Sequence, residues 1–250
     1  MTRPVFLATA GELDPAAPGG TVVLGGDEGR HAATVRRIRT GEEIDLVDGA
    51  GLRVTGTVAD VSRDRLTVTV SAVATDESPA VRLVLVQALA KGGRDEQAVE
   101  AATELGVDAI VPWQAARSVS LWRGAKAEKG RIRWQAIAAS AAKQSRRARV
   151  PTVHEATGDL TAVVTAMLAG GGTVLVLHEE AAESLTAALL PEAGEVAVVV
   201  GPEGGITDVE LAALQQAGAR AVLAGPHVLR TSTAGPAALA VLASRLGRWD

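Results

Sequence analysis

Two apolar runs in the last quarter of the chain each end in a Gly-Pro pair, and polar residues follow both pairs. Gly201-Pro202 leads to Thr207 and Asp208, either of which can cap a helix, and Gly225-Pro226 leads to the hydroxyl-rich segment 231–236. Glycine lets a ligand approach the backbone and proline fixes the turn. Two such turns at neighbouring strand ends therefore predict a crevice for a small molecule. Two ordinary turns of a parallel sheet are the alternative interpretation.

Positive charge gathers in the segment 115–150. This segment contains ten Lys or Arg residues and one acid, whereas residues 151–219 contain ten acids and no Lys or Arg. The formal net charge of −4 for the whole chain hides this asymmetry. Because arginine forks match phosphate geometry, the segment is a candidate RNA-binding surface. A solvated helix face without a ligand is the alternative.

Missing residues and spacings exclude several kinds of site. The chain has no cysteine, which removes disulfides, thiolate metal sites and a cysteine nucleophile, and we expect no metal site. The Gly-rich stretch 91–94 lacks the spacing of a nucleotide-hydrolysing P-loop, and no GxGxxG loop with a downstream acid is present. No apolar run reaches the length of a signal-peptide core or a membrane span, so we expect a soluble, cytoplasmic protein.

Strand and helix patterns alternate from residue 81 to residue 246, which predicts an α/β fold with a parallel sheet. The predicted strands are Val81–Gln87, Asp108–Val111, Thr173–Leu177, Glu195–Val200 and Ala221–Leu223. The predicted helices are Asp95–Leu105, Ala125 to about Arg146, Asp159–Leu168, Ser184–Leu189, Asp208–Ala217 and Ala234–Leu246. We expect the crevice at the carboxyl ends of these strands.

The first 75 residues have the pattern of a separate, mostly β module. A helix is predicted at Glu28–Arg37, and Asp76–Pro79 is the expected linker. His31 either packs against the module or contacts RNA, and the arginines at the end of the helix either meet phosphates or face solvent. The predicted strands of this module are Thr21–Leu24, Glu43–Val47, Leu52–Ala59 and Leu66–Val73.

Four sequence segments resemble a known family. They are GPEGGITDVE with the later LRTSTA, KGGRDEQAVEAATELGVDAIVP, the pair Arg117-Ser118, and RW followed by AAKQSRR and VP. Together with the N-terminal module they resemble the RsmE-type enzymes of the SPOUT superfamily of methyltransferases over the full length. The resemblance implies a SPOUT domain at 80–250, whose parallel sheet carries a C-terminal trefoil knot, preceded by a small PUA-like β-barrel RNA-binding domain at 1–75. Such a knot is an exception to the rule that chains do not thread loops.

The same resemblance implies an activity. Family members methylate N3 of a specific uridine in 16S ribosomal RNA of the small subunit, with S-adenosylmethionine as methyl donor, and we expect a homodimer. Two alternatives stay open. One is a SPOUT enzyme that methylates a ribose 2′-hydroxyl, and the other is an RNA-binding protein without catalytic activity.

The resemblance also implies site residues. Because uridine N3 carries a proton, transfer needs a base or a stabilised anion; Glu203 is the candidate base and Arg230 the candidate for stabilising the anion. Three positions depart from the family pattern, namely Ser232 in place of Glu, His227 in place of Arg and Ala101 in place of Lys. The expected donor-binding residues are Leu177, His178, Gly201, Gly205, Ala224, Gly225, Leu229, Ser232, Thr233 and Ala234. The expected RNA contacts are His31, Arg36, Arg94, Arg117, Gln144, Arg146 and Arg147.

Overall fold

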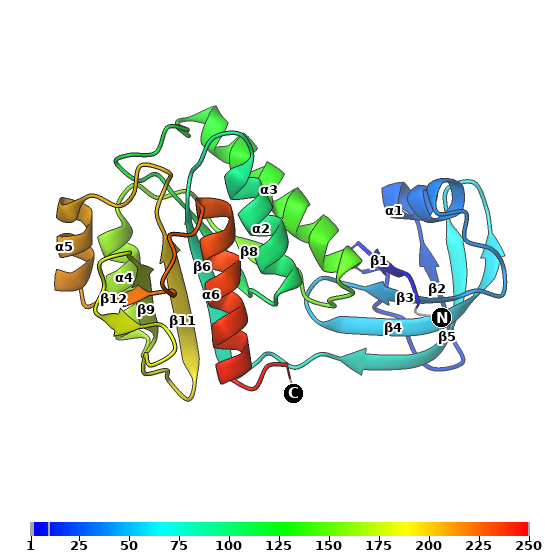
Figure 1. Ribbon diagram of the computed structural model, residues 1–250. Helices are drawn as coiled ribbons and strands as arrows, with labels where there is room; N and C mark the ends of the chain where they lie inside the picture. Colours follow the sequence, from blue (N-terminus) through cyan, green and yellow to red (C-terminus); the bar gives the residue numbers. More distant parts are fainter. Residues whose placement is uncertain (1–2, 10, 250) are drawn as a thin grey trace. The chain divides into compact units, whose positions relative to one another are not determined.

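The structure is a computed structural model that describes residues 3–9 and 11–249 (Figure 1). The chain divides into two compact units, one comprising Met1–Ser78 with Ala142–Val150, the other Pro79–Ala141 with Pro151–Asp250. The sequence predicted one domain at 1–75 and a second at 80–250. Residues 1 and 250, at the outer ends of these two domains, lie outside the described residues. The prediction assigns residues 142–150 to the second domain, whereas the contacts of this segment group it with the first.

The N-terminal unit contains a five-stranded sheet in the order β1-β3-β4-β5-β2. β1 pairs in parallel with β3, and the other neighbours are antiparallel. Alternating side chains of these strands, with Phe6, bury an apolar core, which is why the period-2 pattern predicted four of them. The strands are β1 (Val5–Leu7), β2 (Thr21–Leu24), β3 (Glu43–Val47), β4 (Leu52–Val61) and β5 (Leu66–Thr75). β1 was not predicted, because three residues show no period.

The helical segment of this unit is not one regular helix. α1 (Gly26–Arg30) continues into a π-helical turn, η1 (His31–Val35). In this turn the Arg36 N–H donates to the His31 carbonyl at 2.9 Å, five residues back. The prediction of a single helix at Glu28–Arg37 therefore placed the helical segment correctly. It was wrong about the helix type, which changes at His31, and about the last helical residue, which is Val35.

The segment 142–150 is bound to the N-terminal unit by polar and apolar contacts. Lys143 Nζ lies 2.5 Å from Glu28 Oε1, and the Arg53 guanidinium donates to the Arg146 carbonyl at 2.9 Å. The Arg149 guanidinium donates twice to the Asp76 carbonyl, at 2.6 and 3.1 Å. Ala148 is buried together with Val5 and Val47. These contacts make the segment a structural part of the N-terminal unit.

The second unit is built on a seven-stranded, fully parallel sheet in the order β10-β12-β9-β11-β6-β7-β8. Its central strands are continuous runs of β-branched and apolar residues, as expected when both faces of a sheet are covered. The strands are β6 (Val81–Ala88), β7 (Ala109–Trp113), β8 (Thr152–Val153), β9 (Thr173–Leu177), β10 (Glu183–Ser184), β11 (Gly194–Val200) and β12 (Arg220–Leu223).

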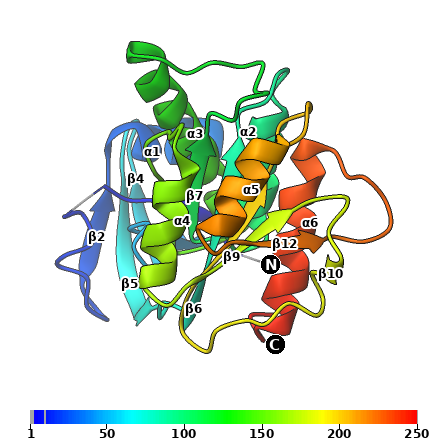
Figure 2. The same ribbon diagram turned by 90° about the vertical axis from the view of Figure 1, so that its left-hand side faces the viewer.

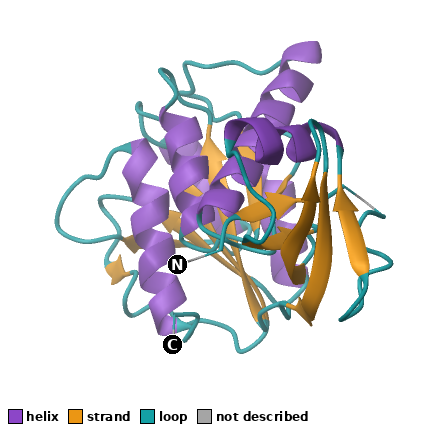
Figure 3. Ribbon diagram, turned by 90° about the vertical axis from the view of Figure 1, so that its right-hand side faces the viewer, coloured by secondary structure: helices purple, strands orange, loops and turns teal. Residues whose placement is uncertain are grey.

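Helices cover both faces of this sheet (Figures 2 and 3). On one face, Leu160 and Leu214, from two of the helices, pack in one core with Ala197 of β11. On the other face, a Cβ added at Gly235 would lie 2.7 Å from Leu85 Cδ1, so the last helix packs closely on β6. The helices are α2 (Arg94–Glu104), α3 (Ala125–Gln144), α4 (Leu160–Ala169), α5 (Asp208–Gln216) and α6 (Thr231–Arg245). None of the described helices is long and apolar enough to cross a membrane.

Two helix predictions in this unit were wrong. Residues 184–189 do not form a helix. Ser184 pairs with Leu223 in the sheet, and its hydroxyl accepts the Thr186 N–H in a local turn. The last helix begins at Thr231 rather than Ala234, because the Arg230 carbonyl already accepts the N–H groups of Thr233 and Ala234. The three hydroxyl residues 231–233 thus belong to the first turn of the helix.

Candidate active site

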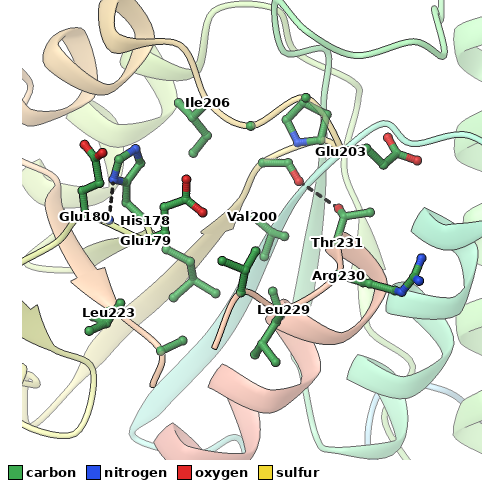
Figure 4. A pocket seen from close by; sticks show the side chains of 18 of the residues that line it. His178, Glu179, Glu180, Val200, Glu203, Ile206, Leu223, Leu229, Arg230 and Thr231 are labelled. Atoms are coloured by element: carbon green, nitrogen blue, oxygen red, sulfur yellow. Dashed lines mark hydrogen bonds between the residues drawn. The ribbon is translucent and has the colours of Figure 1, made fainter. Parts of the chain in front are cut away.

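A cavity of about 660 Å³ opens at the carboxyl ends of β9, β11 and β12, the edge at which ligands bind in parallel α/β sheets. Its walls come from three loops, which follow β9, β11 and β12 (Figure 4). Apolar side chains such as Leu223 and Leu229 and backbone of several glycines form much of the lining. A volume of this size fits a ligand as large as a nucleoside derivative.

The loop after β11 is joined to the start of α6 by a buried hydroxyl. Thr231 Oγ1 donates to the Gly201 carbonyl at 2.8 Å and accepts from Gln87 Nε2 at 2.9 Å. Gln87 is fully buried at the end of β6, next to β11, and Thr231 is 7% exposed. The two loops that carry the Gly-Pro pairs are thereby fixed to each other at the floor of the cavity.

Glycines keep this cavity open where the backbone lines it. Gly225 has φ +114°, and a Cβ added there would meet no atom within 4 Å, so its backbone faces open space. At Gly201, by contrast, a Cβ would lie 2.7 Å from Ile206 Cγ1. The first glycine leaves room beside the backbone, and the second allows the loop after β11 to fold tightly toward α5.

An ion pair joins the loop after β6 to the loop after β11. Glu203 Oε1 lies 3.1 Å from Arg94 Nη1 and accepts the Lys91 N–H at 3.2 Å. Burial raises the pKa of the Glu203 carboxyl, but hydrogen bonds from its own N–H, the Lys91 N–H and Arg94 outweigh burial, so the net pKa is lowered. A carboxylate held in this way is a weak proton acceptor, and the geometry favours a role in positioning Arg94.

Arg117 reaches the cavity from the loop after β7. Its Nη1 donates to the Gly204 carbonyl at 3.0 Å, and the preceding Ala116 N–H donates to Glu210 Oε1 at 2.7 Å. Glu210 also forms a capping box with Thr207 at the start of α5, so Thr207, of the two predicted candidates, is the cap. One carboxylate thus orients both the helix and the loop that carries Arg117.

Ionisable side chains lie on both sides of the cavity. His178, Glu179 and Glu180 follow β9 on one side, whereas Arg230 lies on the same side as Glu203 (Figure 4). The Glu180 N–H donates to His178 Nδ1 at 3.3 Å, which fixes the histidine ring toward its own loop. The Arg230 side chain is exposed and makes no hydrogen bond or ion pair with any residue that the structure describes. It is available to a ligand.

The structure gathers most of the predicted site residues around one cavity. Both predicted catalytic residues, Arg230 and Glu203, line it, as do Arg94 and Arg117. Of the predicted donor-binding residues, eight line the cavity, namely Leu177, His178, Gly201, Gly205, Ala224, Gly225, Leu229 and Ala234. Ser232 and Thr233 are not in the lining, although Thr231 and Ala234 of the same first turn of α6 are.

The other predicted RNA contacts belong to the N-terminal unit. They are His31, Arg36, Gln144, Arg146 and Arg147. Arg36 and Gln144 are exposed there, and His31 is half-buried.

The sequence did not single out two polar groups that hold the site together. The sequence places Thr231 only within the hydroxyl-rich segment 231–236, and Gln87 only at the end of a predicted strand. Gln87 is a polar residue that directly follows the apolar run LVLV, and that position alone could have marked it. Within the described residues, no group of three or more His, Asp or Glu side chains is arranged to hold a metal ion.

Family models match both units. The model described as an RNA methyltransferase domain matches residues 76–243, which is more than half of the chain. The chain belongs to the RNA methyltransferase family. A second model, described as an RNA methyltransferase PUA domain, matches residues 24–71, so the N-terminal sheet is of PUA type in this family.

Relatives cover almost the whole chain. Ribosomal RNA small subunit methyltransferase E of Mycobacterium bovis is 49% identical over 93% of this chain and 89% of its own length. The Bacillus subtilis protein of the same name is 31% identical over 89% of this chain and 90% of its own length. A crystal structure of ribosomal RNA small subunit methyltransferase E from Neisseria gonorrhoeae, bound to S-adenosyl methionine, superposes with a TM-score of 0.85 at 31% identity and 98% coverage of both chains. The RsmE-type resemblance is confirmed.

Proposed function

We propose that this chain methylates N3 of a specific uridine in 16S ribosomal RNA, with S-adenosylmethionine as the methyl donor. The observation that carries the proposal is the near full-length similarity to small-subunit methyltransferase E, at 49% identity over 93% of the chain. It is supported by a cavity at the carboxyl ends of β9, β11 and β12 with eight of the ten expected donor-binding residues in its lining. A cytoplasmic location follows from this substrate.

The cavity has the features that a bent S-adenosylmethionine needs. Its volume of about 660 Å³ suits a ligand of that size, and Gly225 leaves open space beside a backbone that can bond to adenine. Leu177, Leu223 and Leu229 supply apolar walls. Glu179 and Glu180 supply negative charge for a cationic ligand. We infer that backbone groups of the three loops recognise the donor, which supplies an electrophilic methyl group when bound.

Arg230 is the residue we assign to the uracil. A uridine whose N3 has lost its proton carries negative charge on N3 and its neighbouring oxygens. An exposed guanidinium without a protein partner can donate hydrogen bonds to that anion, and such charge-assisted bonds favour its formation. Glu203 has a lowered pKa and an ion pair with Arg94, so we assign it to holding the loop after β6. The group that takes the proton then lies elsewhere, in the RNA, in water or in a partner subunit.

Two sets of residues, all basic except Gln144, would bring RNA to this cavity. Arg94 and Arg117 line it. His31, Arg36, Gln144, Arg146 and Arg147 are offered by the PUA-type unit, and phosphate contacts of this kind position RNA without reading its sequence.

A trefoil knot and a homodimer belong to the same proposal. The tie between Thr231 and Gly201 supports a close passage of the loops after β11 and β12, as a knot requires. Apolar residues of α6 that are only half-buried, such as Val241, support a dimer contact there. Sedimentation equilibrium tests the dimer, and the chain path in a crystal structure tests the knot.

Methyl transfer to purified small subunits tests the activity. The subunits come from a strain that lacks its own enzyme, and the donor carries a labelled methyl group. We expect one labelled nucleoside, N3-methyluridine, and one new stop in primer extension, because the methyl group blocks the pairing edge of the base. Arg230→Ala should reduce the rate by about 10²-fold or more. Label in a ribose 2′-O-methyl nucleoside would support the alternative SPOUT activity, and binding of RNA without label would support a non-catalytic protein.

A further inference from the structure

The loop between β7 and α3, residues 114–124, is fastened at both ends by one side chain. Gln114 Nε2 donates to the Ser120 carbonyl at 3.0 Å, and Gln114 Oε1 accepts the Trp122 N–H at 2.9 Å. Together with the bond from the Ala116 N–H to Glu210, these contacts hold the backbone on both sides of Arg117. A loop of this length would otherwise sample many conformations.

The apolar anchor of the loop is Trp122, and it is seated on a glycine. Its ring lies edge to face against Trp134 of α3, with centroids 5.1 Å apart and an interplanar angle of 66°. Trp134 is 1% exposed, so this neighbour is fixed in the core. A Cβ added at Gly130 would lie 2.4 to 2.7 Å from three atoms of the Trp122 ring. Any residue with a Cβ at this position of α3 would overlap the indole ring, so only glycine leaves room for it.

A glycine inside a helix costs about 1 kcal/mol relative to alanine, so Gly130 weakens α3. Gly130 lies in the second turn of the helix, where its φ is not positive, so the backbone itself does not require glycine. The room that Gly130 leaves for the Trp122 ring is therefore the physical reason for a glycine at position 130. The loop that the seat serves carries Arg117 into the cavity wall and exposes Val119 and Leu121, at 64% and 45%.

We propose that Trp122, seated against Gly130 and Trp134, is a positioning residue that fixes the 114–124 loop so that Arg117 meets the RNA at the mouth of the cavity. The proposal rests on the proposed function, because it takes RNA as the substrate. Trp122 acts through the loop. When the indole no longer packs against Gly130 and Trp134, the loop becomes mobile and Arg117 is no longer held beside Gly204. RNA binding weakens, whereas the donor site, formed by the loops after β9, β11 and β12, stays intact.

Three variants test this positioning role: Gly130→Ala, Trp122→Ala and the double variant. We expect each to raise KM for the RNA about tenfold, the size expected for loss of one charge-assisted hydrogen bond. We expect kcat and the Kd for S-adenosylmethionine to change less than twofold. The double variant should be no worse than either single one, because both changes remove the same contact. Trp122→Phe, which keeps a ring on the seat, should restore most of the affinity for RNA.

Gly158→Ala is the matched control. A Cβ there would meet nothing within 4 Å and its φ is not positive, so we expect wild-type kinetics. Trypsin gives a readout that needs no substrate: cleavage after Arg117 or Arg123 in the folded protein should be faster in Gly130→Ala than in the control. Wild-type KM and wild-type cleavage in Gly130→Ala would overturn the positioning role. Failure of the wild-type chain to methylate RNA would instead overturn the proposed function.

Discussion

The Thr231 hydroxyl donates to the carbonyl of Gly201 at 2.8 Å, across thirty positions of sequence. It also accepts from the amide of Gln87, in the strand β6 that neighbours β11. One buried hydroxyl thus connects the strand β6, the loop after β11 and the start of α6. Because the loop after β11 and the start of α6 line the cavity that we assign to the donor, the strength of this connection should determine how well that cavity is preformed.

Thr231→Val should weaken both stability and donor binding. The change keeps the shape of the side chain but leaves the Gly201 carbonyl without its hydrogen bond, which costs about 1–3 kcal/mol for a buried group. Urea unfolding measures the free energy, and calorimetry measures the Kd for S-adenosylmethionine. Thr231→Ser keeps the hydroxyl and is the control. Equal loss in both variants would mean that the methyl group, rather than the hydroxyl, matters.

Gly225→Ala should reduce donor affinity more than its effect on stability explains. The added Cβ would enter open space in the cavity, at a residue with φ +114°. Gly171→Ala is the matched control, because Gly171 has φ +78°, also has nothing within 4 Å and lies outside the cavity lining. We expect both variants to lose about 1 kcal/mol of stability from the backbone strain. Only Gly225→Ala should raise the Kd for the donor. A similar Kd in the two variants would contradict the assignment of this turn to the donor.

Glu203→Gln distinguishes positioning from proton transfer. If Glu203 only holds Arg94 and the Lys91 N–H, the glutamine retains a hydrogen-bond acceptor, and we expect kcat to fall less than tenfold while KM for the RNA rises. A general base would instead contribute about 10²–10⁴-fold to kcat. The pH profile gives a second measurement, since loss of a base removes the acid limb of kcat. If kcat falls by more than 10²-fold and the acid limb of its pH profile disappears, Glu203 acts as the general base.

Asp95 should make stability depend on pH at the start of α2. Burial, the largest effect, raises the pKa of its carboxyl above the ordinary value of 3.8, and hydrogen bonds from the Ala90 and Glu96 N–H groups offset part of the rise. A raised folded-state pKa means that the folded protein binds the proton more tightly than the unfolded chain. The stability from this group is therefore full below pH 3.8 and is lost as the pH rises through the folded-state pKa.

Urea unfolding of wild type and Asp95→Asn across this pH range checks the sign. We expect the stability of wild type relative to the variant to be greatest at low pH and to fall as the pH increases. Asp64→Asn, at an exposed carboxyl, is the control for removing one negative charge. A relative stability that increases with pH would show that the hydrogen bonds, rather than burial, dominate at Asp95.

The sequence predicted the parallel sheet well because its strands are apolar runs separated by helices with clear ends. It failed at residues 184–189, where an Ala/Leu composition favours a helix. There, tertiary contacts decide the outcome, since the Arg245 guanidinium donates to the carbonyls of Leu185 and Ala188. Edge strands of two or three residues, such as β1 and β8, carry no detectable period.

Residues that line the cavity were predicted where a motif carries them, and residues that hold it together were missed where only packing connects them. The Gly-Pro turns gave Gly201 and Gly225 directly. The seat that Gly130 offers Trp122, and the tie between Gln87 and Thr231, join residues that no local pattern connects. Side-chain contacts between distant segments follow from the fold, so a single sequence does not reveal them.

The burial of Ala148 beside Val5 and Val47 bears on how this protein can be dissected. The main chain enters the PUA-type unit a second time, between residues 141 and 151, so no single scission liberates that unit whole. A fragment that stops at Ser78 would expose an incomplete hydrophobic cluster and leave the Asp76 carbonyl without Arg149. Such a fragment should aggregate or bind RNA poorly for reasons of folding, and only a circularly permuted or loop-bridged version that keeps 142–150 would report the affinity of the module itself.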